Sequence, residues 1–131
     1  MIAVDASAIC AIAFGEPERA EFVAVLRAAD GALVSPVNRW EAAVSVQRRR
    51  PGGAGERVVQ DILTRAGIAV ADIGATEAEA AFDAWRKFGK GRHPAALNLG
   101  DCFAYALAMS RDLPLLFKGD DFPKTDVRSA L

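Results

Sequence analysis

Ile2-Ala3-Val4-Asp5 is a short apolar run that ends in an acid. Three later stretches are apolar runs of the same length that are also bounded by turn residues. These stretches are residues 32–34, 68–70 and 115–117. Short apolar runs bounded by turn residues are typical of strands that are buried on both faces of a sheet. The sequence therefore predicts at least four short buried strands.

Helical patterns separate the predicted strands. They cover residues 7–14, 17–29, 40–50, 56–66, 76–88 and 100–110. Pro51-Gly52-Gly53 stops the third helix, Thr76 with Glu79 forms a capping-box pattern, and Asn98 is a cap for the last helix. Strands that alternate with helices predict an α/β domain, with a central parallel sheet of about four or five short strands flanked by helices.

The composition is that of one ordinary globular domain spanning residues 1–131, with 52% hydrophobic and 25% charged residues. The longest stretches without a charged residue, 6–15 and 102–110, are about half of the roughly 20 residues that a membrane helix needs. The chain opens without a basic leader, so we expect a cytoplasmic protein. Cys10 and Cys102 lie in apolar runs without metal-ligand spacing, which favours buried free thiols.

Acidic residues occur where predicted strands end. Asp5 closes the first strand, Glu41 follows the second, and Asp120-Asp121 follow the last. Asp101 opens the helix that leads into the last strand. Because the carboxyl ends of parallel strands share one edge of a sheet, the topology is expected to bring these acids together.

A cluster of carboxylates requires protonation, a basic partner or a cation, because two anions about 4 Å apart repel by roughly 4 kcal/mol at an effective dielectric constant near 20. Oxygen ligands select Mg²⁺ or Mn²⁺ over zinc. Each acid alone also fits a turn or a helix cap. Ser7 and Asn38 lie near the same edge and are candidates to support the carboxylates, although a cap at Ser7 and a turn at Asn38 explain them equally well.

At these residues the chain resembles the PIN-domain ribonucleases, specifically the VapC toxins of bacterial type II toxin-antitoxin pairs. The likeness covers the whole chain and rests on residues 1–8, 35–43, 88–94, 97–106 and 115–122. The two most specific segments contain Asn98-Leu99-Gly100-Asp101 and Phe117-Lys118-Gly119-Asp120-Asp121-Phe122. The resemblance implies a single PIN-like domain with three layers.

The resemblance also implies a metal-dependent endoribonuclease that cuts transfer or ribosomal RNA and arrests translation. Its acidic residues would be Asp5, Glu41, Asp101 and Asp120, with Asp121 as the second choice for the fourth acid. One or two Mg²⁺ or Mn²⁺ ions would be held by the three aspartates, with Glu41 on a second ion or a water. Water would attack the phosphodiester, leaving 5′-phosphate and 3′-hydroxyl ends.

Family likeness further implies partners. A cognate VapB-like antitoxin would occupy a groove formed by the early helices, and the chain would form homodimers or toxin-antitoxin hetero-oligomers. Lys90, Arg92 and Lys118 are the candidates to bind RNA, whereas His93 is not required as a base. The net charge of −1 neither favours nor excludes a nucleic-acid partner.

Other functions compete with this prediction. Gly119-Asp120-Asp121 resembles the magnesium motif of haloacid dehalogenase-type phosphatases, but their second acid is replaced here by Ser7. A phosphoacceptor receiver domain needs an acid after a middle strand, and neither Val34 nor Val70 is followed by one directly. A PIN module that binds an antitoxin without cutting RNA has no reason to keep a full set of mutually repelling acids.

Overall fold

The computed structural model describes residues 1–50 and 52–131, and within these ranges the chain forms strands and helices in alternation. The strands are β1 (Ile2–Val4), β2 (Ala32–Val34), β3 (Ile68–Val70) and β4 (Leu115–Leu116). The helices are α1 (Ala6–Ala13), α2 (Arg19–Ala28), α3 (Pro36–Arg49), α4 (Gly55–Ala66), α5 (Ala75–Phe88) and α6 (Leu99–Ser110), followed by the 3-10 helix η1 (Phe122–Lys124).

All paired strands of the described residues run parallel, in the order β3-β2-β1-β4. The chain first builds the sheet outward from β1 to β3 and then returns to place β4 on the other side of β1. This reversal makes the carboxyl ends of β1 and β4 a topological switch point, where open α/β sheets bind their ligands. The backbone N–H of Asp5 donates to the carbonyl of Leu116 at 2.9 Å, which fixes the two strand ends side by side.

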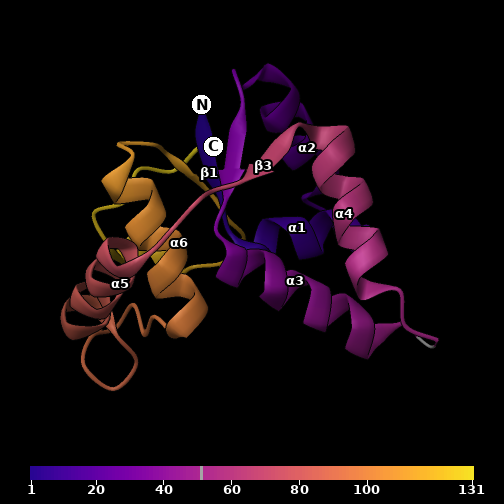
Figure 1. Cartoon of the computed structure of the whole chain (residues 1–131). Coiled ribbons are helices and arrows are strands. Elements are labelled where there is room, and N and C mark those ends of the chain that lie inside the picture. The colour runs from indigo at the N-terminus through magenta and orange to yellow at the C-terminus, as the bar shows by residue number, and fades with distance from the viewer. Residues whose placement is uncertain (51) are drawn as a thin grey trace.

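Side chains on the two faces of the sheet enter separate apolar clusters. Val4 and Leu116 pack with α1–α4, whereas Ala3 and Leu115 pack with α5 and α6. Figure 1 shows these two groups of helices on opposite sides of the strands. This alternation explains why β1 and β4 are apolar throughout, and it confirms the predicted three-layer α/β architecture. The prediction that β3 is buried is wrong for Ala69 and Val70, which are exposed because β3 lies at the edge of the sheet.

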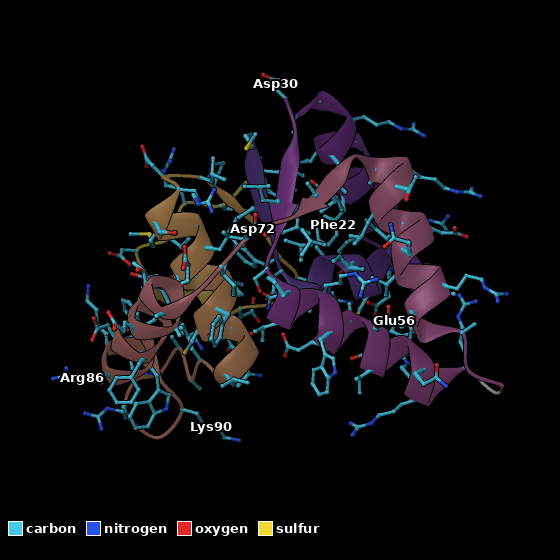
Figure 2. The ribbon with its side chains drawn as sticks, in the orientation of Figure 1. Phe22, Asp30, Glu56, Asp72, Arg86 and Lys90 are labelled. Carbon is cyan, nitrogen blue, oxygen red and sulfur yellow. The ribbon has the colours of Figure 1, made fainter. Side chains whose placement is uncertain are left out.

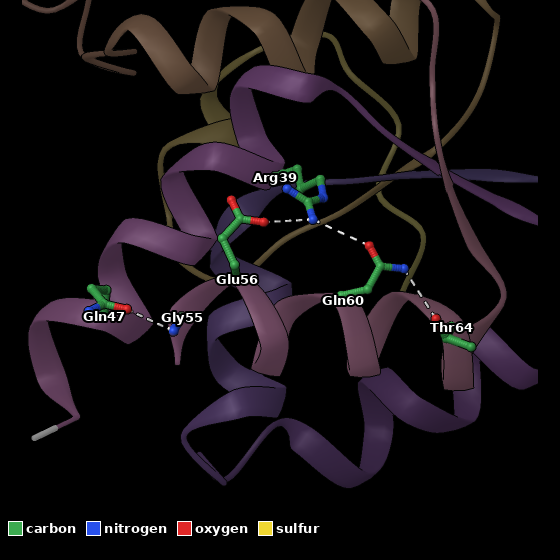
Figure 3. A network of polar contacts seen from close by, with 6 residues as sticks. All are labelled: Arg39, Gln47, Gly55, Glu56, Gln60 and Thr64. Carbon is green, nitrogen blue, oxygen red and sulfur yellow. Dashed lines mark hydrogen bonds and ion pairs between the residues drawn. The ribbon is translucent and has the colours of Figure 1, made fainter. Parts of the chain in front are cut away.

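Polar contacts join α3 to α4. The guanidinium of Arg39 donates to Gln60 at 3.3 Å and forms an ion pair with Glu56 at 2.9 Å, and the N–H of Gly55 donates to Gln47 at 2.9 Å (Figure 3). These contacts lie on the outer side of the two helices. They hold α3, which carries two of the candidate site residues, against the rest of its layer.

Several helix boundaries differ from the sequence prediction. Helix α3 begins at Pro36 rather than at residue 40, because Ser35 caps it and the fixed φ of proline suits a first helical position. The turn predicted at Asn38 is therefore wrong. The predicted cap at Thr76 is also wrong, since the carboxylate of Glu77 accepts from the N–H of Gly74 at 2.8 Å.

The remaining predictions about organisation have mixed outcomes. Pro51, part of the predicted stop of α3, lies outside the described residues. Strand β4 ends at Leu116, one residue before the predicted end. Cys10 and Cys102 are free thiols, the first partly buried and the second buried. No helix of the described residues is long and apolar enough to cross a membrane.

Candidate active site

Asp5 is the most buried acid at the edge of the sheet, with 4% of its surface exposed. It follows β1 directly and caps α1, because its carboxylate accepts from the N–H of Ser7 at 3.0 Å and from the Ser7 hydroxyl at 2.5 Å. The cap predicted at Ser7 is thus provided by Asp5. Burial raises the pKa of Asp5, and the hydrogen bonds from Ser7 partly oppose this rise.

Ser7 connects Asp5 to the last strand. Besides donating to Asp5, its hydroxyl accepts from the backbone N–H of Lys118 at 3.0 Å. The Lys118 ammonium points to the loop after α1, where it pairs with Glu16 at 3.1 Å and Glu18 at 3.3 Å. The segment that follows β4 is therefore anchored beside Asp5 through both its backbone and its side chain.

Asn38 joins three elements at the center of the site. Its side chain is fully buried, and its amide nitrogen donates to Glu41 at 3.0 Å and to the Gly100 carbonyl at 2.9 Å. The same nitrogen lies 3.4 Å from Asp5. Asn38 thus links the end of β1, the first turns of α3 and the start of α6, which is a supporting position of the kind expected for it.

Glu41 lies one turn after Asn38 on α3 and faces the start of α6. Its pKa is raised to about 7, chiefly by burial and also by the nearby charges of Asp5 and Asp101. A β-carbon on Gly100 would overlap the Glu41 carboxylate, so any other residue at position 100 would displace that carboxylate from its observed place. Glu41 was a candidate site residue from its sequence position, whereas no role was predicted for Gly100.

Asp101 opens α6 and shares a reciprocal cap with Asn98. The N–H of Asp101 donates to the Asn98 side chain at 2.9 Å, and the N–H of Asn98 donates to the Asp101 carboxylate at 3.1 Å. The pKa of Asp101 is raised to about 6, chiefly by burial and also by the charges of Asp5 and Asp121. Asp101 can therefore cap α6 and also belong to the acid cluster.

Asp120 and Asp121 are exposed on the segment after β4. Gly119 precedes them with a φ of 112°, a conformation that favours glycine. Asp121 stands immediately before η1, and its charge acts on the pKa of Asp101. Asp120 is not among the groups that shift that pKa.

Together these acids form an electrostatically coupled group at the switch point. Within residues 1–50 and 52–131, no three or more histidine, cysteine, aspartate or glutamate side chains lie close enough together in this structure to hold a metal ion. The charged neighbours that shift the pKa values of Glu41 and Asp101 are all acidic. Carboxylate oxygens without a basic partner are the ligand type that hard divalent cations prefer, so the donor chemistry of these residues suits such a cation.

The other candidate RNA-binding residues lie on the loop between α5 and α6. Lys90 and Arg92 are exposed, and Figure 2 shows Lys90 and Arg86 on the same lower side of the molecule, around the end of α5. The Arg92 guanidinium lies 5.0 Å above the Trp85 ring. Lys90 and Trp85 line a largely apolar hollow of about 380 Å³ that also reaches Asn98, the cap partner of Asp101. This loop therefore approaches the acidic edge from the side of α6.

Residues 2–128 match the family model of the PIN domain. This chain belongs to the PIN-domain family. It is 41% identical to "VapC ribonuclease Mb0640" of Mycobacterium bovis, over 95% of this chain and 94% of the relative. It is 43% identical to "Ribonuclease VapC42" of Mycobacterium tuberculosis, over 97% of both chains. A "Ribonuclease VapC" of Mycolicibacterium smegmatis is also 43% identical, over 95% of both chains.

A solved structure shows the same PIN fold. The crystal structure of Mycobacterium tuberculosis VapC20, whose title describes a Sarcin-Ricin loop cleaving toxin, matches with a TM-score of 0.73 over 98% of this chain and 99% of that chain. The two sequences are 19% identical, so this likeness supports the fold. The predicted family and fold class are both confirmed.

Two residues of this PIN domain escaped the sequence analysis. Gly100 is buried against Glu41, and a glycine in the first turn of a helix, between Leu99 and Asp101, was the available signal. Ser35 is buried and caps α3, and Ser35-Pro36 is itself a pattern that begins helices. Both residues lie next to a predicted site residue in space, but only the fold reveals that proximity.

Proposed function

We propose that this PIN domain is a Mg²⁺- or Mn²⁺-dependent endoribonuclease toxin of a type II toxin-antitoxin pair, which cuts transfer or ribosomal RNA in the cytoplasm and so inhibits translation. The observation that carries the proposal is the grouping of Asp5, Glu41 and Asp101 around Asn38 at the switch point of the sheet. VapC ribonucleases that are 41% to 43% identical over nearly the whole chain support it.

The residues that would hold one or two divalent ions are Asp5, Asp101 and an acid after β4, with Glu41 on a second ion or through a water. A bound divalent ion supplies a water nucleophile at neutral pH and neutralises negative charge on a phosphodiester. Asn38 keeps Glu41 and Asp5 at a fixed separation through its amide. Ser7 holds the carboxylate of Asp5 in one orientation.

The electrostatics of the site favour one of the two aspartates after β4 as the fourth acid. The sequence ranks Asp120 first and Asp121 second. The charge of Asp121 raises the pKa of Asp101, whereas that of Asp120 is not among the causes. We therefore assign the fourth position to Asp121, and Asp120 becomes the alternative.

RNA would approach across the exposed cations beside the acids. Lys90 and Arg92 offer charge on the loop before α6, and cations of this kind bind the phosphate backbone without reading sequence. Lys118 would contribute only after leaving Glu16 and Glu18. Cleavage by water needs no histidine, in keeping with the orientation of His93, whose Nδ1 accepts from the N–H of Ala95 at 3.0 Å.

A VapB-like antitoxin is the proposed partner, and its proposed binding site is a hollow of about 500 Å³ among α1, α2 and α4. Ile12 of α1 and Leu26 of α2 belong to the apolar core and also line this hollow. We propose a homodimer as the state of the free toxin.

Cleavage of total cellular RNA by purified, antitoxin-free protein tests the proposal. The reactions contain Mg²⁺, Mn²⁺ or EDTA, and an Asp5→Asn variant purified in parallel excludes a contaminating ribonuclease. Cuts at a few discrete positions that need metal and disappear in the variant would support the proposal, and the sequenced ends would identify the target. Absence of metal-dependent cleavage would contradict it and favour a PIN module that only binds its antitoxin.

A further inference from the structure

Ser35 is a buried hydroxyl that makes two hydrogen bonds with one residue. It accepts from the backbone N–H of Asn38 at 3.0 Å, which caps α3. It also donates its own proton to the side-chain oxygen of Asn38 at 2.5 Å. A cap requires only the first of these bonds. The second acts on the side chain of Asn38 and needs another explanation.

The second bond determines which way the Asn38 amide faces. A primary amide has one accepting oxygen and one nitrogen with two protons. In the observed orientation the oxygen meets the Ser35 proton, while the nitrogen meets oxygens of Glu41, Gly100 and Asp5. In the reversed orientation the amide oxygen would face two carboxylates and a carbonyl without a donor. Ser35 therefore supplies the donor that the observed orientation requires.

We infer that Ser35 is a positioning residue for the acid cluster: its hydroxyl fixes the Asn38 amide, which in turn holds Glu41, Asp5 and the start of α6 at their working separation. This inference rests on the proposed function, since the working state of the cluster is the one that binds metal. Both residues are fully shielded from solvent, so water cannot replace the missing donor without a rearrangement.

Capping and positioning can be separated by substitution. Glycine is tolerated at helix N-caps nearly as well as serine but has no hydroxyl, so Ser35→Gly removes the bond to the Asn38 oxygen at little cost to the helix. Ser35→Thr keeps a hydroxyl at the same position. Glu77→Ala is the matched control for a lost helix cap, because Glu77 caps α5 at Gly74 and makes no bond to the acids.

The test is calorimetric titration of the metal-free proteins with Mn²⁺. We expect Ser35→Gly to bind Mn²⁺ about tenfold or more weakly than the parent, the usual effect of losing a group that orients metal ligands. Ser35→Thr and Glu77→Ala should bind like the parent. Folded Ser35→Gly protein with the affinity of the parent would overturn the inference.

A second measurement uses the parent alone and does not depend on the folding of a variant. Nuclear magnetic resonance should show that the side-chain amide protons of Asn38 exchange slowly with solvent. Exchange as rapid as that of an exposed asparagine would contradict a fixed amide. If the parent shows the fixed amide but binds no Mn²⁺, the proposed function fails and the inferred role in metal binding fails with it. Equal Mn²⁺ binding by parent and Ser35→Gly removes only the role of Ser35.

Discussion

The carboxylate of Glu41 occupies the space that a β-carbon on Gly100 would need. Glu41 and Gly100 lie this close because the side-chain amide of Asn38 donates to both residues. It donates to the Glu41 carboxylate at 3.0 Å and to the Gly100 carbonyl at 2.9 Å. Two helices that are distant in the sequence thus meet through one amide and one glycine. This relationship makes Gly100 a sensitive position for activity rather than for folding.

Gly100→Ala should lower metal-dependent cleavage by about tenfold or more while leaving thermal stability equal or slightly higher. Alanine favours a helix over glycine by about 0.5–1 kcal/mol, and the clash falls on the flexible end of Glu41. The measurements are RNA cleavage and thermal unfolding of the same preparations.

A double-mutant comparison controls this prediction. In a Glu41→Ala background the added methyl of Gly100→Ala meets no carboxylate, so the second substitution should have little further effect on cleavage. If Gly100→Ala lowers cleavage by the same factor in the parent and in Glu41→Ala, then Gly100 does not act on activity through the Glu41 carboxylate.

The sequence predicted the sheet and its acidic edge because both follow from local patterns. A short apolar run that ends in an acid, as in Ile2 to Asp5, identifies the strand and the position of its carboxyl end together. Because strands alternate with helices, the sheet is parallel and the carboxyl ends of its strands share one edge. The acids at those ends are therefore expected at the same edge, although the sequence gives no distances. The strand predictions accordingly differ from the structure by a single residue, at the end of β4.

The start of α3 was missed although Ser35-Pro36 is a pattern that can begin a helix, and the contacts of Asn38 could not be read from the sequence. Asn38 follows Ser35-Pro36, a pair that suits a turn as well as a helix start, and only packing against α6 decides between them. The role of Gly100 depends on a partner 59 positions away in the chain. Such relations between distant residues leave no periodic signal in one sequence.

Asp121→Asn should reduce cleavage more than Asp120→Asn. Both residues are exposed neighbours on the same segment, so each substitution serves as the control for the other in charge, size and folding. The coupling of Asp121 to Asp101 predicts a loss of about tenfold or more for Asp121→Asn and a smaller one for Asp120→Asn. Initial cleavage rates at saturating Mn²⁺ provide the measurement, and the reverse ranking would return the fourth position to Asp120.

Tyr105→Phe should destabilise the protein by about 1 kcal/mol without changing its cleavage activity. The Tyr105 hydroxyl donates to Asp126 at 2.6 Å and so ties the C-terminal segment to α6, on the side of the sheet away from α3. Urea unfolding with and without the substitution measures the free energy of unfolding. A large loss of cleavage in the stable variant would place this contact in the working site.

The metal-free protein should lose stability as the pH rises from about 4.5 to about 7, and Glu41 should cause part of this loss. Folding raises the pKa of Glu41 from 4.5 to about 7. The folded state therefore binds a proton more tightly than the unfolded state, and the resulting stability is complete below pH 4.5 and disappears as the pH passes the folded value. Asp101, with its pKa raised from 3.8 to about 6, acts in the same direction.

Thermal unfolding in EDTA across this range, for the parent and for Glu41→Gln, measures the effect. Glutamine keeps the size of the side chain and removes its titration, so the variant should show a flatter profile and unfold at a higher temperature than the parent near pH 7.5. Adding Mn²⁺ should stabilise the parent at pH 7.5 and much less at pH 5, where protonated carboxyls compete with the ion. Parallel pH profiles for the two proteins would mean that another group already balances the charge of the Glu41 carboxylate in the metal-free protein. That result would remove the electrostatic argument for a cation at this edge of the sheet.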